Sequence, residues 1–583
     1  MAATAVPARP GGPIARIGAL APALALAFGG ATAALAASDV LNPGSRLGRL
    51  LAADLPLDAL GPGDLAAALG AVTLVAIALG LRRGKRRSWE LGVLLLGSAT
   101  LSQALALRHP VGATIAGVLL GVLLLGWRRY VVPAERPGRR LLALATLGIV
   151  AAATDAVLAL AVPAARLDPA IGLRTAAGAL AGIASFGSVP ALAWLTGHGG
   201  ILAVATLAVR MPLALFAIAA LRPAPAPPDA EAAAAAGAIL RRDGHGALLP
   251  FQLEPDKTRL VTPDGAVVAY GRYGRTAVAL GNPAGPAAAI AGAWEAFASA
   301  CRAGDLVPAV YQASGDQRAA LLTAGFRPFR VGQEAIIDLA TFDLAGSRRA
   351  NLRHTVTRAR KGGVSFRFHP GGIPAAERER LLPGLAAIDR AWAEAAGPAM
   401  GFTVGAFDLD AVDRTAIAVA LDADGAPIAF TTFRPTGADG GWVLDLMRRR
   451  AGGTPGALEG CIAAAAAGLR AAGASALSLG LAPLAGLDDA SASPEERALA
   501  RAAALVRRWY DVRGLAFFKG KFDPRWEPRY AAVGARAELP GFVLALLGLH
   551  LGGFRHAARA LVPAPARPAT RCPRAAAASG SPR

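Results

Sequence analysis

The stretch WVLDLMRRRAGGTPGA, at residues 442–457, combines an apolar strand, a basic glycine-containing loop and the start of a helix. The Thr454–Pro455 pair predicts the helix N-terminus, with threonine as the N-cap and proline at the first helical position. Backbone N–H groups at a helix N-terminus bind anions, and three arginines add positive charge there: Arg448, Arg449 and Arg450. This stretch therefore predicts an α/β fold with an anion site between a strand and the following helix.

An acidic residue, Asp445, lies inside this cationic stretch. Its role is either to neutralise the neighbouring arginines or to position an amine and accept a proton, and the residues alone leave both open. In an ideal strand Asp445 and Arg448 point to opposite faces of the sheet, because they are three positions apart and side chains alternate between the faces. Joint action of the two side chains therefore requires a β-bulge or a strand end between them.

Short strands alternate with Ala-rich helices on both sides of this stretch, from about residue 240 to 535. Such alternation is typical of α/β or α+β layers, and its length suits two domains of similar size. The expected strands cover residues 258–262, 266–271, 276–281, 307–312, 333–339, 427–433, 441–447 and 475–480. The expected helices cover residues 286–303, 315–324, 379–396, 456–472 and 494–509.

A second basic segment, GSRRANLRHTVTRARKGG at residues 346–363, predicts a helix that ends at two glycines. Three apolar residues form its inner face: Leu352, Val356 and Ala359. Cations line two outer edges, with Arg349, Arg353 and Arg360 on one and His354, Arg358 and Lys361 on the other. A solvated charged face is the alternative, but no acid within the helix pairs with these cations, and an uncompensated row favours a phosphate backbone.

A third basic segment, YDVRGLAFFKGKFDPRWEPRY at residues 510–530, interleaves aromatic residues with cations. Its cations include Lys519, Lys521, Arg525 and Arg529, and prolines 524 and 528 interrupt it. Stacking residues among cations suit the single-stranded end of an RNA. An irregular, well-packed closing segment is the alternative that these residues leave open.

The N-terminal part of the chain is strongly apolar up to about residue 222. Six runs have close to the ~20 residues that span a bilayer. They lie at residues 14–37, 63–81, 90–107, 111–127, 141–165 and 200–221, and residues 176–197 are interpreted as an interfacial or re-entrant piece. Basic loops at residues 82–87 and 128–140 predict, by the positive-inside rule, that residue 222 and everything after it lie in the cytoplasm.

The overall composition narrows the classes of function. The chain has 583 residues, of which 54% are hydrophobic and 17% charged, and its formal net charge is +21. This excludes both a single ordinary soluble enzyme and a chain disordered throughout, and the positive excess favours a nucleic acid or an acidic lipid surface. Three scattered cysteines form no disulfide framework, and the sequence has no HExxH, Walker A or GxSxG motif. We therefore expect no metal and no cofactor.

These segments together resemble the phosphatidylglycerol lysyltransferase family (the multiple peptide resistance factor family) over about residues 235–540. The motifs that carry the resemblance occur in the family's order. They are GNPAGP at 281–286, Tyr311–Gln312, residues 332–339, Phe342, Leu344, Gly346, Leu352–Arg353, Arg358, Trp392, Gly401–Phe402, Gly405, DLMR at 445–448, GLAPL at 480–484, RGL at 513–515, FKGKF at 518–522, Pro524, Trp526 and Arg529–Tyr530.

The resemblance implies a multi-pass α-helical membrane bundle followed by tandem GCN5-related acyltransferase-like domains in the cytoplasm, at the inner membrane of a bacterial-type cell. The expected regions are a transmembrane domain at 1–221, a linker at 222–239, acyltransferase-like domains at 240–370 and 371–539, and an amphipathic helix with a disordered basic tail at 540–583. For the helix near residue 540, a second membrane contact and plain packing both remain open.

The activity that the resemblance implies is transfer of an aminoacyl group from aminoacyl-tRNA to phosphatidylglycerol, with lysyl first and alanyl or another group as alternatives. The ester is already activated, so alignment and stabilisation of the oxyanion replace a covalent nucleophile. The expected catalytic residues are Asp445, Arg448, Lys519 and Lys521. The expected substrate-binding residues are Tyr311, Gln312, Arg349, Arg353, Arg358, Phe402, Arg449, Arg450, Gly480 and Arg529. Self-association into a homo-oligomer is left open.

The chain departs from the family pattern at a few positions. Ala399 and Met400 stand where an acidic residue usually precedes the Gly-Phe pair, Thr357 replaces an asparagine, and Asn282 replaces an aspartate. These differences bear on the choice of amino acid. Two other functions stay open. One is a membrane-tethered N-acyltransferase that uses acyl-CoA, because residues 449–454 approximate the pyrophosphate-binding loop of such enzymes. The other is a non-catalytic scaffold that binds lipid or RNA.

Overall fold

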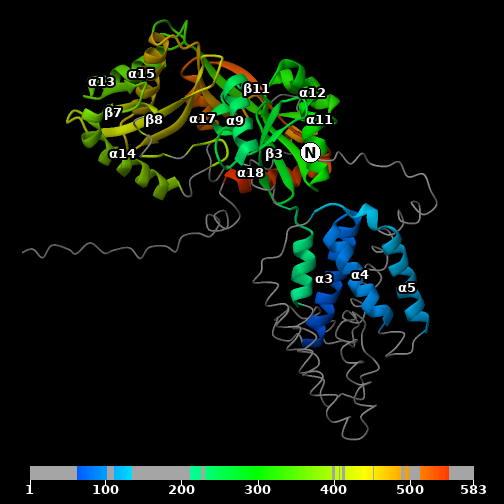
Figure 1. Cartoon of the computed structure of the whole chain (residues 1–583). Coiled ribbons are helices and arrows are strands. Elements are labelled where there is room, and N and C mark those ends of the chain that lie inside the picture. Colours follow the sequence, from blue (N-terminus) through cyan, green and yellow to red (C-terminus); the bar gives the residue numbers. More distant parts are fainter. Residues whose placement is uncertain are drawn as a thin grey trace, which may run out of the picture. The chain divides into compact units, whose positions relative to one another are not determined.

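The computed structural model describes residues 62–101, 110–133, 211–224, 230–396, 401–405, 407–409, 412, 414–450, 452–487, 493–497 and 512–550 (Figure 1). The chain divides into two compact units. One consists of residues 1–228 with 300–306, and the other of residues 229–299 with 307–583. Each unit is described by itself.

The first unit is helical where it is described. It contains α3 (Pro62–Arg82), α4 (Arg86–Leu101), α5 (Pro110–Leu125), the short η3 (Trp127–Arg129) and helical residues 211–220. Ile77, Leu91 and Leu123 contribute to one buried apolar core, and the indole N–H of Trp89 donates to the Leu123 carbonyl at 2.9 Å. Among the described residues, none of the helices combines the length and apolar character that a membrane crossing requires.

The predicted membrane spans are therefore covered only in part. The runs at 63–81, 90–107 and 111–127 correspond to α3, α4 and α5, and the run at 200–221 is described from residue 211 onwards. The runs at 14–37 and 141–165, and the segment 176–197, lie outside the described residues.

The second unit is built on one large sheet, with strand order β1-β2-β3-β4-β11-β5-β10-β9-β8-β7-β6. The strands are β1 (Thr258–Val261), β2 (Val267–Tyr273), β3 (Thr276–Leu280), β4 (Val307–Ala313), β5 (Arg327–Asp338), β6 (Ser365–His369), β7 (Ala416–Leu421), β8 (Pro427–Pro435), β9 (Trp442–Arg449), β10 (Ala476–Pro483) and β11 (Arg525–Val533). Two neighbouring pairs are parallel, β3 with β4 and β9 with β10, and the others are antiparallel.

Helices connect and cover these strands. They are α9 (Ala230–Asp243), α10 (Leu249–Gln252), α11 (Ala287–Ala303), α12 (Arg318–Thr323), α13 (Ala350–Lys361), α14 (Ala375–Ala396), α15 (Ala457–Ala471), α17 (Val512–Gly520) and α18 (Leu539–His550), with short η5 (Gly315–Gln317) and η6 (Arg536–Glu538). Each parallel strand pair is joined by a helix, α11 between β3 and β4 and α15 between β9 and β10, as a parallel connection requires.

The sequence of β7, AIAVAL, explains how helices cover both faces of the sheet at one end. Its alanines, 416, 418 and 420, contribute to the same apolar core as α13 and α15. The larger Ile417, Val419 and Leu421 contribute to a second core with α14. Figure 1 accordingly shows α13 and α15 on one side of β7 and β8 and α14 on the other. Small side chains on one face admit the Ala-rich helix α15, while branched side chains fill the other face.

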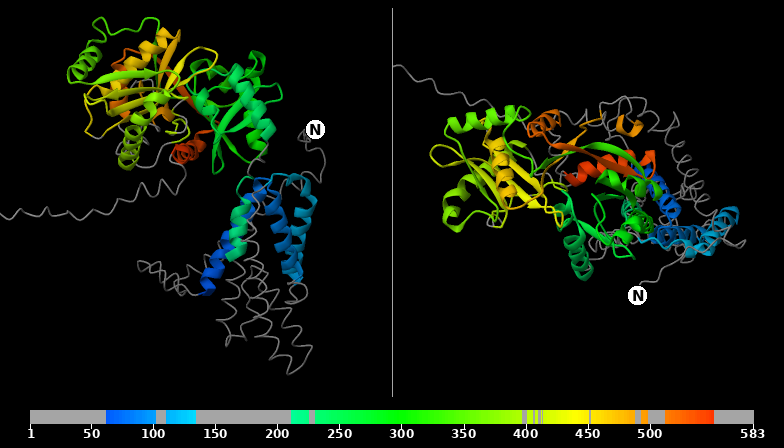
Figure 2. Two further views of the ribbon diagram at one scale, coloured as in Figure 1. Left: turned by 60° about the vertical axis from the view of Figure 1, so that its left-hand side comes forward. Right: turned by 90° about the horizontal axis from the view of Figure 1, so that it is seen from above.

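The two halves of the sheet exchange strands at its centre. β5 precedes β6 in the chain but pairs with β10, and β11, the last strand, lies between β4 and β5. β6, in residues assigned to the first predicted domain, pairs with β7 at the opposite edge. In the view from above in Figure 2, the late strands (orange) accordingly continue into the earlier green part of the sheet. The boundary at residue 370 therefore does not separate the strands, although the division into two acyltransferase-like domains stays a prediction.

All predicted strands overlap observed ones, but three observed strands, β6, β7 and β11, were not expected, and helix α9 begins inside the linker predicted at 222–239. β7 was not expected because its alanine-rich sequence, AIAVAL, does not favour a strand by composition. β11 was not expected because Pro528 argues against a central strand. Pro528 is tolerated because β4 pairs with β11 only from Tyr530 onwards. At Pro528 the edge of β11 that faces β4 is therefore not paired with that strand, and the missing N–H leaves no gap in the β4–β11 ladder.

The predicted N-cap at Thr454 is wrong. α15 begins at Ala457, and its N-cap is Gly456, which has a positive φ of 91°. Thr454–Gly456 instead form a turn in which the Ala457 N–H donates to the Thr454 carbonyl at 3.2 Å. A Cβ at position 456 would lie 2.8 Å from the Thr355 carbonyl of α13, so the turn needs glycine for both its φ and its close packing.

The helix expected near residue 540 exists as α18. Phe542, Ala545 and Gly548 are buried, and the helix packs on β2 and β3. Leu544 and Leu547 remain exposed on its outer side. The inner face is therefore a packing face, and residues 551–583 lie outside the described part of the chain.

Candidate functional site

A β-bulge in β9 orients Asp445 and Arg448. Thr431 of β8 pairs with Met447, whereas Phe433, two residues further along, pairs with Leu444, three residues back. Strand β9 thus has one extra residue between these pairs, and the Leu446 N–H donates to the Thr432 hydroxyl at 3.2 Å. This is the bulge that joint action of Asp445 and Arg448 requires.

Asp445 is held by a glycine loop, residues 401–405. The Gly405 N–H donates to Asp445 Oδ1 at 2.8 Å. A Cβ at position 405 would lie 2.6 Å from Asp445 Oδ2, so only glycine permits this approach. Burial raises the pKa of the Asp445 carboxyl, against the lowering effects of the Gly405 hydrogen bond and of Arg434. A half-buried carboxylate with a raised pKa suits proton transfer or binding of an amine.

Arg448 is fixed by α14. Its Nε lies 3.1 Å from Asp389 Oδ1, and its guanidinium carbon lies 3.5 Å from the centre of the Trp392 ring. Asp389 and Trp392 are three residues apart on α14 and share one face of that helix. Ion pairing and stacking together leave the planar guanidinium in one orientation, which suits recognition of a phosphate or carboxylate.

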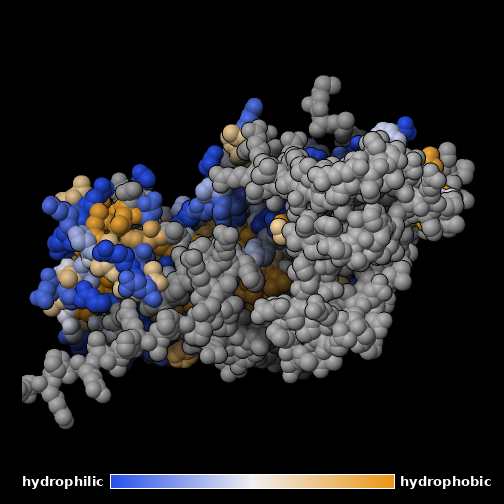
Figure 3. All heavy atoms as spheres, turned by 90° about the horizontal axis from the view of Figure 1, so that it is seen from below, coloured by the Kyte–Doolittle hydropathy of each residue, from blue (hydrophilic) through white to orange (hydrophobic). Residues whose placement is uncertain are grey.

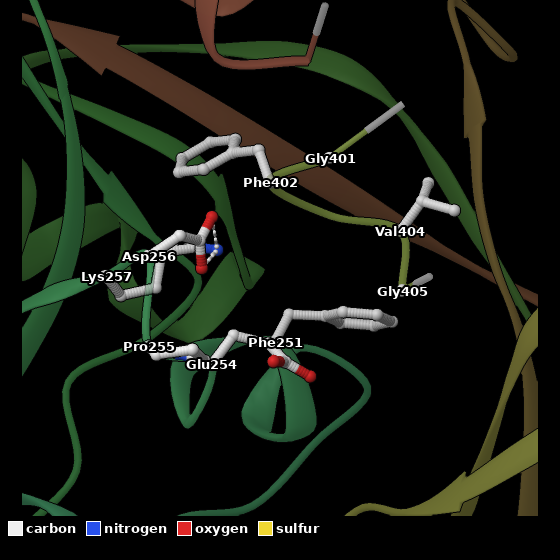
Figure 4. A pocket seen from close by; sticks show the side chains of 9 residues that line it. All are labelled: Phe251, Glu254, Pro255, Asp256, Lys257, Gly401, Phe402, Val404 and Gly405. Atoms are coloured by element: carbon white, nitrogen blue, oxygen red, sulfur yellow. Dashed lines mark hydrogen bonds and ion pairs between the residues drawn. The ribbon is translucent and has the colours of Figure 1, made fainter. Parts of the chain in front are cut away.

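A cavity of about 140 Å³ lies next to the Gly401–Gly405 loop (Figure 4). It is lined by Phe251, Glu254, Pro255, Asp256, Lys257, Gly401, Phe402, Val404 and Gly405. Gly405 both lines the cavity and donates to Asp445, so this glycine connects the cavity wall to that carboxylate. Figure 4 shows the cavity between the loop that follows α10 and the Gly401–Gly405 loop, with the Asp256–Lys257 pair marked by dashed lines.

The Gly401–Gly405 loop is anchored by the last residue of α18, His550. Gly401 N–H donates to the His550 carbonyl at 2.8 Å, and the Thr403 hydroxyl lies 3.0 Å from His550 Nε2. His550 Nδ1 lies 2.8 Å from the Leu546 carbonyl, which can only accept, so Nδ1 carries the proton. Burial lowers the pKa of His550, and the neutral ring can accept the Thr403 hydroxyl at Nε2.

Phe402, a predicted substrate-binding residue, lines this cavity, and Tyr311, another, packs against Phe402. Their rings stack with centres 6.5 Å apart, and His550 meets both edge-on. Phe402 is buried and has a φ of 66°. Gln312, beside Tyr311 at the end of β4, is buried and has a φ of 63°. We therefore interpret these residues as shaping the cavity.

The ladder between β9 and β10 ends early. Only Trp442 and Val443 pair with Leu477 and Ser478, although both strands continue for several residues. Beyond this point β10 bulges at Gly480, which has a φ of 75°. The carboxyl ends of neighbouring parallel strands are the usual position for a ligand in such sheets. Asp445 and Arg448 lie on the β9 side of this region.

Lys519 of α17 lies on the β10 side. Its Nζ donates to the Leu481 carbonyl at 2.7 Å, and the side chain is almost fully buried. Burial lowers the pKa of Lys519 to about 7, against the opposing effect of Glu334. Near neutral pH, a substantial fraction of this amine is therefore uncharged and can accept a proton.

Glu334 of β5 connects Gly480 and Arg529. It accepts hydrogen bonds from the Ser478 hydroxyl and from Arg529 Nε, the latter at 2.6 Å. Ser478 Oγ in turn accepts the Gly480 N–H at 3.0 Å. Arg529, a predicted substrate-binding residue, is thus engaged in an ion pair inside the sheet and supports the bulge beside Lys519.

Of three other predicted cations, Lys521 and Arg450 contact other residues of the chain and Arg449 is exposed. Lys521 lies 2.9 Å from Glu459 of α15 and near the rings of Phe517 and Phe518. Arg450 donates to the Pro427 carbonyl at 3.0 Å. Arg449, at the end of β9, is exposed. Of the two predicted catalytic lysines, Lys521 is therefore ion-paired with α15, whereas Lys519 contacts β10.

The predicted basic helix is α13, and its predicted inner residues, Leu352, Val356 and Ala359, are buried. Arg349 and Arg353 fold back onto the preceding loop. Arg353 donates to the Leu344 and Gly346 carbonyls at 2.8 Å, and Arg349 donates to the Asp343 carbonyl at 3.2 Å. The exposed cations of α13 are Arg353, His354, Arg358, Arg360 and Lys361, of which Arg353 is held by the Leu344 and Gly346 carbonyls. This exposed set, rather than Arg349, is available to an anionic partner.

The described surface seen from below in Figure 3 is mainly hydrophilic at the left of the picture, with smaller hydrophobic patches between the hydrophilic residues.

Within the described ranges, no group of three or more His, Cys, Asp and Glu residues is arranged to hold a metal ion. Both described cysteines, Cys301 and Cys461, are buried and unpaired, and burial raises the pKa of each thiol.

Sequence reasoning missed several residues of the site. Glu254, Lys257 and Phe251 line the cavity but lie in a stretch without a recognisable motif, and His550 follows an apolar helix. Asp389 could have been found from its position three residues before Trp392, because that spacing places both side chains on one helical face.

Comparison with known proteins identifies the family. The model of the family described as "Phosphatidylglycerol lysyltransferase, C-terminal" matches residues 238–533, just over half of the chain. The chain belongs to this family. Membership confirms the resemblance seen in the sequence.

Individual relatives are similar over the same part. The phosphatidylglycerol lysyltransferase of Bacillus subtilis (strain 168) is 29% identical over 297 residues, 51% of this chain and 34% of that protein. The lysylphosphatidylglycerol biosynthesis bifunctional protein LysX of Mycobacterium ulcerans (strain Agy99) is 30% identical over 291 residues, 48% of this chain and 26% of that protein. The structure of L-PGS from Bacillus licheniformis has 26% identity and a TM-score of 0.46, covering 54% of this chain and 95% of that one. The chain thus covers about a third or less of these curated relatives.

Proposed function

We propose that this protein transfers an aminoacyl group from aminoacyl-tRNA to a glycerol hydroxyl of phosphatidylglycerol. The observation that carries the proposal is the half-buried Asp445, which lies with a fixed arginine, Arg448, on one side of the unpaired β9–β10 region, with Lys519 on the other. Family membership supports the same reaction, because the named relatives are lysyltransferases of phosphatidylglycerol.

The reaction is an exchange of esters. A hydroxyl of the lipid glycerol attacks the aminoacyl carbonyl, its proton passes to a base, and the ribose oxygen of the tRNA leaves with a proton. We assign the base to Lys519, because burial leaves part of this amine neutral near pH 7. Asp445 binds the α-ammonium of the aminoacyl group, and Arg448 binds a substrate phosphate. Alignment of the hydroxyl with the ester supplies much of the rate enhancement.

We propose further that the N-terminal half attaches the protein to the membrane that contains its lipid substrate. Most of the exposed large apolar side chains among the described residues lie in its helices, including Leu94, Val118 and Leu125. Apolar surface of this kind on packed helices is compatible with contact to lipid. The basic segments between the helices favour a cytoplasmic location for the catalytic half.

The experiment that tests the function uses the full chain in membranes, charged tRNA and phosphatidylglycerol, with the lipid extract analysed by mass spectrometry. We expect aminoacyl-phosphatidylglycerol to form, and its formation to stop when ribonuclease is added first. Acyl-CoA in place of charged tRNA should give no product. A product that depends on acyl-CoA, or binding of both ligands without any lipid product, would contradict the proposal.

The exposed cations of α13 provide a separate prediction about tRNA. Replacing Arg358, Arg360 and Lys361 by alanine should weaken tRNA binding about tenfold or more at 100 mM salt. Each phosphate contact that is lost lowers the number of counterions that binding releases from the RNA. The slope of log affinity against log salt should also become shallower by up to ~3. The measurement is a filter-binding or fluorescence titration at several salt concentrations.

The matched control removes the same charge elsewhere, from the exposed Arg241, Arg318 and Arg414. This control should leave the salt slope unchanged. Equal losses in both triple variants would attribute the effect to net charge and remove α13 from the tRNA site.

A further inference from the structure

The cavity beside Asp445 contains the chemical groups that proteins use to recognise an ammonium ion. Two carboxylates, Glu254 and Asp256, and two aromatic rings, Phe251 and Phe402, line it. Carboxylates pair with ammonium groups, and aromatic faces attract cations. By composition alone, this cavity would suit a lysyl side chain.

Each of these four groups is already engaged by a cation of the chain itself. Arg434 lies 2.6 Å from Glu254 Oε1 and 5.6 Å from the centre of the Phe251 ring. Lys257 Nζ lies 2.6 Å from Asp256 Oδ1 and 5.1 Å from the centre of the Phe402 ring. The carboxylates and the rings are therefore compensated before any substrate enters.

Lys257 is buried, so a substrate ammonium cannot easily replace it as the partner of Asp256. Its side chain is 1% exposed, whereas that of Asp256 is 56% exposed, so the lysine occupies the inner part of the pair. Burial lowers the pKa of Lys257 against the opposing effect of Asp256, so added positive charge nearby is unfavourable. Ala399 and Met400, which precede the cavity loop in the sequence, supply no further carboxylate.

We propose that this cavity receives the side chain of the transferred aminoacyl group and that it accepts an uncharged side chain rather than the lysyl ammonium. This rests on the proposed function, because Gly405, which lines the cavity, also donates to Asp445, the residue that binds the α-ammonium in that reaction. The volume of about 140 Å³ is close to that of a cavity that holds benzene, so side chains from alanine to leucine fit by size. Substrates of this class pair with none of the four engaged groups and need none of them.

The test is a competition in vesicles that contain phosphatidylglycerol. The full chain receives equal amounts of alanyl-tRNA and lysyl-tRNA, and mass spectrometry counts the two aminoacyl lipids. We expect alanyl-phosphatidylglycerol to exceed lysyl-phosphatidylglycerol by at least tenfold. A predominantly lysyl product would overturn the inference while upholding the proposed function. Absence of both products would overturn the two together.

A second measurement asks whether the internal cations cause the selectivity. The double variant Lys257→Met with Arg434→Gln leaves both carboxylates uncompensated, so the ratio of lysyl to alanyl product should rise at least tenfold. The control Arg318→Gln removes an exposed charge on α12 and should not change the ratio. An unchanged ratio in a folded double variant would overturn the inference. If that variant does not fold, the competition with the unaltered protein still decides it.

Discussion

Replacing Asp445 by asparagine should reduce formation of the aminoacyl lipid by roughly a hundredfold, the loss expected when a contact that positions the substrate is removed. Asparagine keeps the size of the side chain and can still accept the Gly405 N–H at its amide oxygen. It removes the negative charge that binds the α-ammonium. The measurement is the rate of lipid product in a single-turnover assay with the protein in excess over charged tRNA.

The stability of this variant separates loss of chemistry from loss of structure. Burial disfavours the ionised Asp445, as its raised pKa indicates, so the neutral amide should be no less stable than the carboxyl near pH 7. The thermal melting temperature should therefore be maintained. The control is Asp424→Asn, which removes an exposed carboxylate from the turn between β7 and β8. A normal rate in Asp445→Asn would remove Asp445 from the mechanism.

The sequence was informative about the fold where hydrophobic pattern and local chemistry agree. The strands from β1 to β5 and from β8 to β10 follow apolar runs bounded by glycine, proline or charged residues, and α13 ends where two glycines follow its last turn. The position of β11 could not be predicted, since a strand that contains Pro528 is tolerated only because of where its neighbour β4 ends. That is a tertiary property without a local signal.

The same distinction applies to the site. Asp445 and Arg448 could be found because acid, arginines and glycines are close together in the sequence, and the required bulge was a testable geometric expectation. The roles of the other cations could not be separated in this way. Arg529 and Lys521 are ion-paired with Glu334 and Glu459, which are far away in the sequence. Lys519 differs from Lys521 in its burial and in its partner, and both depend on the packing of α17 against β10.

The pH dependence of the reaction should identify the state in which Lys519 works. If Lys519 accepts the proton of the lipid hydroxyl, only its neutral form is active, and that fraction falls about tenfold for each pH unit below its pKa. With a pKa of about 7, kcat/KM should rise with pH from 5.5 and level off above about 7.5. If the lysine instead stabilised the oxyanion as a cation, the rate would fall as pH rises through 7. The two roles therefore give slopes of opposite sign.

Replacing Lys519 by methionine tests whether this residue causes the acidic limb of the profile. Methionine fills a similar volume in the buried position but has no amine, so we expect a rate loss of roughly a hundredfold or more. The limb near pH 7 should also disappear, leaving only the dependence that Asp445 contributes at lower pH. Lys521→Met is the matched comparison on the same segment: it breaks the ion pair with Glu459 but should keep the limb. A limb that persists in Lys519→Met, or that disappears only in Lys521→Met, would assign the proton acceptor elsewhere.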